Sequence, residues 1–157
     1  SLGSAIGVYR IAKAMNKDAY IVYNGSGVGI EGLVRKLGKG YEDVLLETEN
    51  IYAKMSEDTL LVIVDTHRKD YVESPEIVDK TNKIVIIDHH RKSTDAIEDA
   101  LLTFQEVYAS SASELVTEML QYVDEKIELP LVEAECLYAG ILTDTKNFMY
   151  QTGVRTF

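Results

Sequence analysis

Two apolar runs constrain the fold of this chain more than any other feature. Residues 59–64 read TLLVIV and residues 83–87 read KIVII, and neither run alternates apolar with polar residues. A strand with one face in water shows such alternation, whereas a strand of a parallel sheet is covered on both faces and reads as a continuous apolar run. The two runs therefore predict strands of a mostly parallel sheet flanked by helices.

The rest of the chain alternates between helical and extended segments. Periodicity and helix-start signals favour helices over 1–16, 31–37 and 75–80, from Ser111 onward, and from Pro130 through Ile141. Extended segments are expected over 19–23 and near 101–105, while 41–58 is ambiguous and partly helical. Ser111 and Glu114 have the spacing of a capping box, and Leu115, Met119 and Tyr122 share one face of the helix that follows. This order of elements predicts an α/β domain.

Charge and composition exclude several classes of function. The chain has 157 residues, about one domain, with 16 Lys and Arg against 26 Asp and Glu and a formal charge of −10. We therefore expect no long nucleic acid as a partner, because phosphate binding relies on Lys and Arg. A small phosphorylated ligand is compatible with this negative charge, since a metal ion can supply positive charge. The single cysteine, Cys136, excludes an internal disulfide. The chain also has no run of about 18 apolar residues, the length that would predict a membrane-spanning helix.

Acidic and imidazole side chains follow both predicted strands. Asp65-Thr66-His67 comes directly after the first run and Asp88-His89-His90 after the second, and these two tripeptides hold all three histidines. Ligands of open α/β sheets collect at the carboxyl ends of the strands, and a mixture of Asp and His favours Mn, Fe or Zn. For Asp65 alone, a turn-forming role is an equal alternative. A serine-type triad is disfavoured because no G-x-S-x-G elbow is present.

A further carboxylate lies in the last predicted helix. The apolar run from Cys136 ends in Thr143-Asp144-Thr145, which places Asp144 near a helix C-terminus. The helix dipole disfavours a carboxylate there, and a bound cation would offset that cost. The alternative is that Asp144 simply faces water.

The same residues resemble the motifs of the DHH phosphoesterase superfamily. The resemblance rests on Asp65, on Asp88-His89-His90 and on the run GILTDT at 140–145, and it extends over nearly the whole chain. It is closest to the DHH domain of GdpP-type bacterial cyclic-di-AMP phosphodiesterases, supported by the runs 64–67, 72–75, 87–91, 108–111, 144–148 and 152–157. Residues 1–157 are thus expected to form a partial DHH domain.

Two parts of the family pattern are not among these residues. In the family, a segment with one His and two Asp precedes the stretch that residues 1–5 resemble, and a DHHA1 domain follows the DHH domain. The resemblance therefore implies that the first strand and the DHHA1 domain are missing here. It also implies that the 157 residues alone are nearly inactive.

The resemblance implies a site with two metal ions, usually Mn²⁺. Asp65 would bridge both ions, and His89 and Asp144 would ligate the second. His90 would lie beside the substrate phosphate, with Asp88 holding or polarising the histidine pair. Candidate substrate contacts are His90, Arg91, Ser110 and Arg155. His67 could also touch the ligand, and for both His67 and Ser110 an ordinary turn or cap role is an equal alternative. For Arg155, a solvated surface position is the stronger alternative.

The implied function is metal-dependent hydrolysis of cyclic di-AMP to pApA. The alternatives are a sister DHH enzyme or a catalytically silent nucleotide-binding fragment. The sister enzymes are an oligoribonuclease that also acts on adenosine bisphosphate, a RecJ-like exonuclease and a family II pyrophosphatase. The resemblance further implies a cytoplasmic domain of a protein attached to the cell membrane, and it allows a homodimer.

Overall fold

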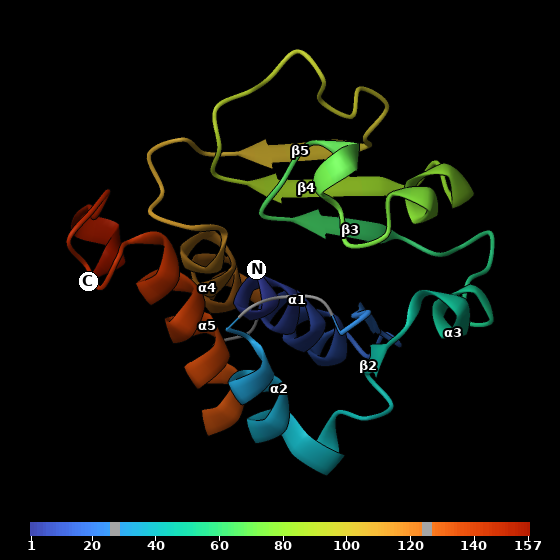
Figure 1. Cartoon of the computed structure of the whole chain (residues 1–157), viewed down its shortest axis with the longest axis horizontal. Coiled ribbons are helices and arrows are strands. Elements are labelled where there is room, and N and C mark those ends of the chain that lie inside the picture. The colour runs from blue at the N-terminus through green and yellow to red at the C-terminus, as the bar shows by residue number, and fades with distance from the viewer. Residues whose placement is uncertain (26–28, 124–126) are drawn as a thin grey trace.

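The computed structural model describes residues 1–25, 29–123 and 127–157. Its helices and strands are α1 Leu2–Ala14, β1 Ile21–Val22, α2 Glu31–Leu37, β2 Leu45–Leu46, α3 Thr48–Tyr52, β3 Leu61–Val64, β4 Ile84–Asp88, β5 Leu102–Gln105, α4 Ala112–Val123 and α5 Leu131–Asp144. The sheet β3-β4-β5 forms one layer, and α1, α4 and α5 pack together on one side of it (Figure 1). A second sheet consists of β1 and β2, which are parallel.

The larger sheet is parallel throughout, as the apolar runs predict. Val64 of β3 is in register with Ile87 of β4, and Asp88 of β4 is in register with Gln105 of β5. All three strands therefore end at the same edge of the sheet, so the residues that follow them lie side by side.

Both faces of β4 are covered, which explains why its sequence does not alternate. Ile84 and Ile86 belong to a buried cluster with Ile77 and Val78 of the 3₁₀ helix Pro75–Lys80. Ile87 instead belongs to a cluster that includes Leu115, Val116 and Leu137 from α4 and α5. Burial on both faces is the pattern expected of a parallel strand. The prediction of an α/β fold with a mostly parallel sheet is confirmed.

Some elements differ from the sequence-based expectation. The strand predicted over 19–23 is limited to β1, and the ambiguous segment 41–58 contains both β2 and α3. The helix predicted over 75–80 is of the 3₁₀ type. Of the residues predicted to share one face of α4, Leu115 is fully buried, whereas Tyr122 is 89% exposed, because it lies in the last turn, beyond the buried stripe that ends at Leu120.

The predicted capping box at the start of α4 forms only in part. The backbone N–H of Glu114 donates to Ser111 Oγ at 3.0 Å, as expected. The Glu114 carboxylate, however, accepts hydrogen bonds from the backbone N–H and the hydroxyl of Ser110. The helix start is thus stabilised through Ser110 as well as Ser111.

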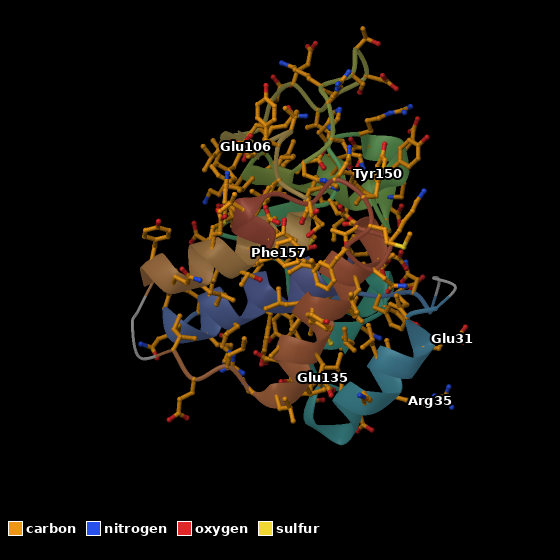
Figure 2. The ribbon with its side chains drawn as sticks, turned by 90° about the vertical axis from the view of Figure 1, so that its left-hand side faces the viewer. Glu31, Arg35, Glu106, Glu135, Tyr150 and Phe157 are labelled. Atoms are coloured by element: carbon orange, nitrogen blue, oxygen red, sulfur yellow. The ribbon has the colours of Figure 1, made fainter. Side chains whose placement is uncertain are left out.

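Surface helix α2 completes the arrangement on the side away from the sheet. Glu31 and Arg35 are exposed and point outward from α2 (Figure 2). Leu37, at the end of α2, is buried. Among the residues described, none of the helices combines the length and apolar character needed to cross a membrane.

Candidate metal centre

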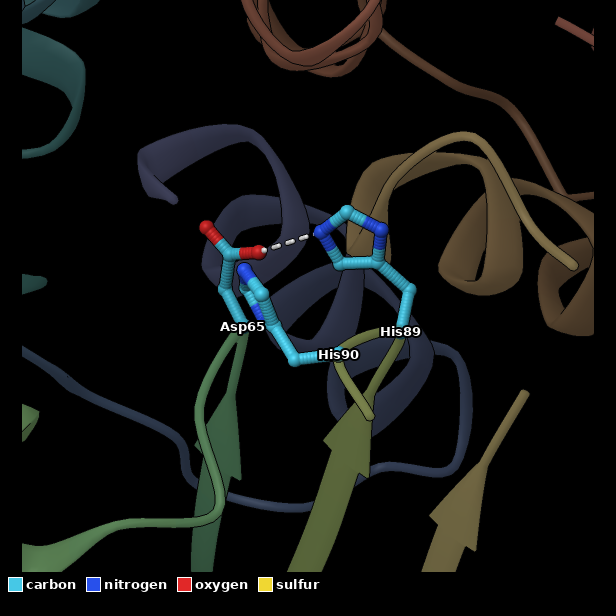
Figure 3. Close-up of side chains that lie close together, drawn as sticks. All are labelled: Asp65, His89 and His90. Carbon is cyan, nitrogen blue, oxygen red and sulfur yellow. Dashed lines mark ion pairs between the residues drawn. The ribbon is translucent and has the colours of Figure 1, made fainter. Parts of the chain in front are cut away.

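The site begins where β3 and β4 end. Asp65 directly follows β3, and its backbone N–H still donates to Ile87 O of β4 at 2.9 Å. Its φ of 67° lies in the left-handed region, which Asp tolerates better than most side chains. His89 and His90 directly follow β4. This backbone path brings all three side chains together at one edge of the sheet (Figure 3).

Potential metal ligands converge from three elements. One ligand atom each from Asp65, His89 and His90 lie within 4.8 Å of one another. His89 Nε2 is 3.4 Å from Asp65 Oδ1 and 3.8 Å from Asp144 Oδ2, and Asp144 is the last residue of α5. The structure thus brings together the three residues expected to ligate metal, although they are far apart in the sequence.

Two carboxylate oxygens at this site lack hydrogen-bond partners among the described residues. They are Asp65 Oδ1 and Asp144 Oδ2, and both are buried. A buried acceptor without a partner is costly, and more so when it carries charge. Both oxygens lie near His89 Nε2, so a cation between these three residues would satisfy them. The donor set therefore fits a divalent ion of the Mn, Fe or Zn type.

The protonation behaviour of the three residues reflects their proximity. Burial and the nearby Asp65 carboxylate raise the pKa of Asp144. Burial would also raise the pKa of Asp65, but the nearby His89 imidazole lowers it. Burial would lower the pKa of His89, but the surrounding carboxylates raise it overall. The site therefore concentrates negative charge that a cation would stabilise.

Asp88 lies behind the metal-ligand cluster and is fully buried. Its Oδ1 accepts hydrogen bonds from His90 Nδ1 at 2.7 Å and from the backbone N–H of His89 at 2.8 Å. Its Oδ2 lies 2.5 Å from His67 Nδ1. Asp88 thus bonds to both histidines, to the side chain of His90 and to the backbone of His89.

The structure places only some of the predicted substrate contacts at the candidate metal centre. Arg91 and His90 line a cavity of about 490 Å³ that also includes Asp65. Ser110 is buried, and its hydroxyl donates to Glu114, away from this cavity lining. Arg155 donates from Nε to Glu118 at 2.6 Å on the surface. Of the candidate contacts, His90 and Arg91 lie at the site, whereas Ser110 and Arg155 are occupied elsewhere.

Sequence reasoning did not identify two residues that support the site. Gln105 ends β5, and its amide donates to the backbone oxygen of His90 at 2.6 Å. Ser93 contacts His67 from the loop after β4. The signal for Gln105 was present, because it ends the third strand at the same edge of the sheet. No comparable signal marked Ser93.

The motif resemblance is tested directly by comparison with a known family. The model of the DHH family, N-terminal domain, matches residues 1–141 of this chain. The chain belongs to the DHH family. The DHH motif that names it corresponds to Asp88, His89 and His90 at the end of β4.

Similar proteins place this DHH chain near one group within the family. It is 43% identical to the cyclic-di-AMP phosphodiesterase GdpP of Bacillus subtilis, over 100% of this chain and 24% of the relative. It is 36% identical to the cyclic-di-AMP phosphodiesterase PdeA of Listeria monocytogenes, over 99% of this chain and 24% of the relative. This chain therefore spans about a quarter of the length of these curated relatives.

A solved structure shares the fold of this DHH chain. An exopolyphosphatase-related protein from Bacteroides fragilis matches with a TM-score of 0.72 over 98% of this chain and 45% of that protein. The two sequences are 21% identical, so the likeness concerns the fold.

Proposed function

We propose that this chain is the DHH part of a metal-dependent phosphodiesterase that hydrolyses cyclic di-AMP to pApA. The observation that carries the proposal is the convergence of Asp65, His89 and Asp144, with two buried carboxylate oxygens that lack partners among the described residues. The relatives named as cyclic-di-AMP phosphodiesterases support the choice of substrate. Residues 1–157 would form the DHH domain of a longer enzyme.

In the proposed reaction, Asp65, His89 and Asp144 hold the metal. When bound, divalent ions such as a pair of Mn²⁺ neutralise phosphoryl oxygens and lower the pKa of an attacking water. His90 contacts the substrate phosphate through the ring nitrogen that Asp88 does not bind. Arg91, on the wall of the same cavity, adds positive charge for the phosphate.

We further propose a cyclic dinucleotide as the substrate, by analogy with the relatives named as cyclic-di-AMP phosphodiesterases. For the whole protein we propose attachment to the cell membrane with this domain in the cytoplasm, supported by a relative that is named as a membrane protein. The family resemblance also allows a homodimer. A long nucleic acid is disfavoured by the charge of −10, because strand binding needs many Lys and Arg contacts.

The test is an assay of the full-length protein with Mn²⁺ against cyclic di-AMP, pApA and a long single strand. We expect the highest kcat/KM with cyclic di-AMP and pApA as the product. A preference for pApA as substrate would move the function to the oligoribonucleases of this family. A preference for the long strand would contradict the proposal.

A further inference from the structure

His67 is buried beside the candidate metal centre and has hydrogen-bonding partners on both sides of its ring. It is 4% exposed. Its Nδ1 lies 2.5 Å from Asp88 Oδ2. Its Nε2 lies 3.0 Å from the backbone nitrogen of Ser93 and 2.9 Å from the hydroxyl of the same residue.

These partners determine which ring nitrogen of His67 carries the proton. The backbone N–H of Ser93 can only donate, so Nε2 of His67 must accept and cannot itself hold a proton. The proton of the neutral ring is therefore on Nδ1, from which it is donated to Asp88. The Gln105 amide nitrogen lies farther from Nδ1, at 3.4 Å, and donates at 2.6 Å to the backbone oxygen of His90. It is a donor, so it finds no acceptor at an Nδ1 that already carries the ring proton.

The second carboxylate oxygen of Asp88 bonds to His90 and determines which nitrogen of that ring carries the proton. Oδ1 accepts from His90 Nδ1 at 2.7 Å, so His90 also holds a proton on Nδ1. Nε2 of His90 is then the nitrogen left for the substrate, and its side chain is 56% exposed beside the cavity. A hydrogen-bonded chain thus runs from Ser93 through the buried side chains of His67 and Asp88 to His90.

We infer that His67 is a positioning residue for His90: it holds the Asp88 carboxylate so that Asp88 presents Nε2 of His90 to the substrate phosphate. The inference rests on the proposed function, because it assigns His90 to the phosphate. Its physical basis is that an outer hydrogen-bond partner fixes the tautomer and ring orientation of a functional histidine.

Two substitutions at one position separate this role from simple anchoring of the loop at Ser93. In His67→Asn the amide nitrogen stands near the place of Nδ1 and can still donate to Asp88. In His67→Gln the amide oxygen reaches the place of Nε2 and can still accept from Ser93, but the donor to Asp88 is lost. We measure kcat, KM and bound Mn²⁺ for both variants of the full-length protein with cyclic di-AMP.

We expect His67→Gln to lower kcat/KM by about 10- to 100-fold and His67→Asn to lower it by no more than about threefold. Bound Mn²⁺ should stay unchanged in both variants, because His67 is not among the proposed ligands. An equal loss in the two variants, or a greater loss in His67→Asn, would overturn the inference.

A double-mutant cycle tests whether the effect passes through His90. In the His90→Ala background, His67→Gln should lower kcat/KM by no more than about a further twofold, because neighbouring residues that act together are not additive. A full additional loss would show that His67 acts by another route and would contradict the inference.

A third measurement does not depend on activity or on tolerance of the substitutions. Imidazole ¹⁵N NMR of the wild-type full-length protein at neutral pH should show His67 protonated on Nδ1 alone. A proton on Nε2 would overturn the inference whatever the activity. If cyclic di-AMP is not hydrolysed while His67 shows the expected tautomer, the proposed substrate is wrong and the hydrogen-bonded chain to His90 stands.

Discussion

At the scale of single residues, the carboxylates of the candidate metal centre occupy positions that favour a cation. Asp65 has a left-handed backbone and a buried oxygen near His89, and Asp144 ends a helix, where the dipole disfavours negative charge. In the absence of metal, the raised pKa of Asp144 shows that its charge opposes folding, and His89 offsets the burial of the Asp65 oxygen. Their placement is therefore better explained by ligand binding than by folding.

Asp65→Asn should remove metal binding while preserving the fold. Asn tolerates the same left-handed backbone, so the conformational cost is small. The loss of a ligand charge should lower the hydrolysis rate of the full-length protein by at least about 100-fold. Metal content, activity and the melting temperature are the measurements, with Asp79→Asn, at an exposed ion pair to Lys69, as the matched control. A rate above about a tenth of wild type would contradict the metal assignment.

Asp144→Asn should stabilise the metal-free protein at neutral pH. The pKa of Asp144 is raised in the folded state, so folding favours its protonated form and stability falls as the pH rises above the unfolded value of 3.8. The amide variant lacks this penalty and should melt at a higher temperature at pH 7. The difference should vanish below pH 3.8, where wild-type Asp144 is protonated in both states. Thermal denaturation across pH with a chelator present measures this, and a lower melting temperature for the variant at pH 7 would contradict it.

At the scale of elements, helices α1, α4 and α5 approach one another closely through glycines. A Cβ atom on Gly3 of α1 would lie 2.3 Å from the backbone oxygen of Cys136 in α5. A Cβ atom on Gly140 of α5 would lie 2.1 Å from Ser113 Oγ in α4. These contacts hold the end of α5, and with it Asp144, at a fixed distance from the sheet edge.

Gly3→Ala should destabilise the protein by about 1–3 kcal/mol, because the added methyl group forces two backbones apart. Gly32→Ala is the control: no atom of the described residues lies within 4 Å of a Cβ at this position in α2, so the change should stabilise by up to about 1 kcal/mol. Denaturant unfolding of both variants measures the difference. Equal midpoints would show that the close approach of α1 and α5 is not required.

A buried ion pair also joins α1 to α5. Arg10 donates from Nε and from a terminal nitrogen to the Glu133 carboxylate, both at 2.7 Å, and Glu133 is fully buried. The hydroxyl of Tyr41 donates to the same carboxylate, and burial together with Glu133 raises the pKa of Tyr41. The pair therefore fixes α1 and the segment before β2 against α5.

Arg10→Ala should destabilise the protein by about 3–5 kcal/mol, because it leaves the charge of Glu133 buried without its cationic partner. Arg155→Ala, which breaks the surface pair with Glu118, should change the unfolding midpoint very little. Denaturant unfolding of the two variants in parallel is the measurement. A loss in Arg10→Ala no larger than that in Arg155→Ala would refute the structural role of the buried pair.

At the scale of the whole molecule, the net charge of −10 limits how phosphate can be bound. Arg91 beside the cavity and the proposed metal ions supply positive charge locally, and a dinucleotide, unlike a polymer, releases few counterions when it binds. We expect KM for cyclic di-AMP to change by less than about threefold between 50 and 200 mM salt. Steady-state kinetics across salt test this, and a steep rise in KM with salt would indicate a ligand held by many Lys and Arg contacts.

The parallel sheet and one side of the site could be predicted from the sequence. The parallel direction of the strands is predicted by the continuous apolar runs, and a parallel sheet places the residue after each strand at one edge. That geometry is local to the strands, so Asp65, His89 and His90 could be expected to meet before any helix was placed. The helix-end pattern drew attention to Asp144, and the motif resemblance gave it a metal-binding role. The resemblance also pointed to the DHH family, which the family model confirms over residues 1–141.

Only the tertiary structure decided which side chains complete and support this site. Asp144 reaches His89 because α5 packs against α1 and α4 through small residues, and no periodicity encodes that distance. His67 turns toward Asp88 because the loop holding Ser93 folds back over its ring. Ser110 and Arg155 turn instead to Glu114 and Glu118. Such contacts join residues far apart in the chain or depend on the direction in which a side chain points. They are therefore determined by packing rather than by local sequence pattern.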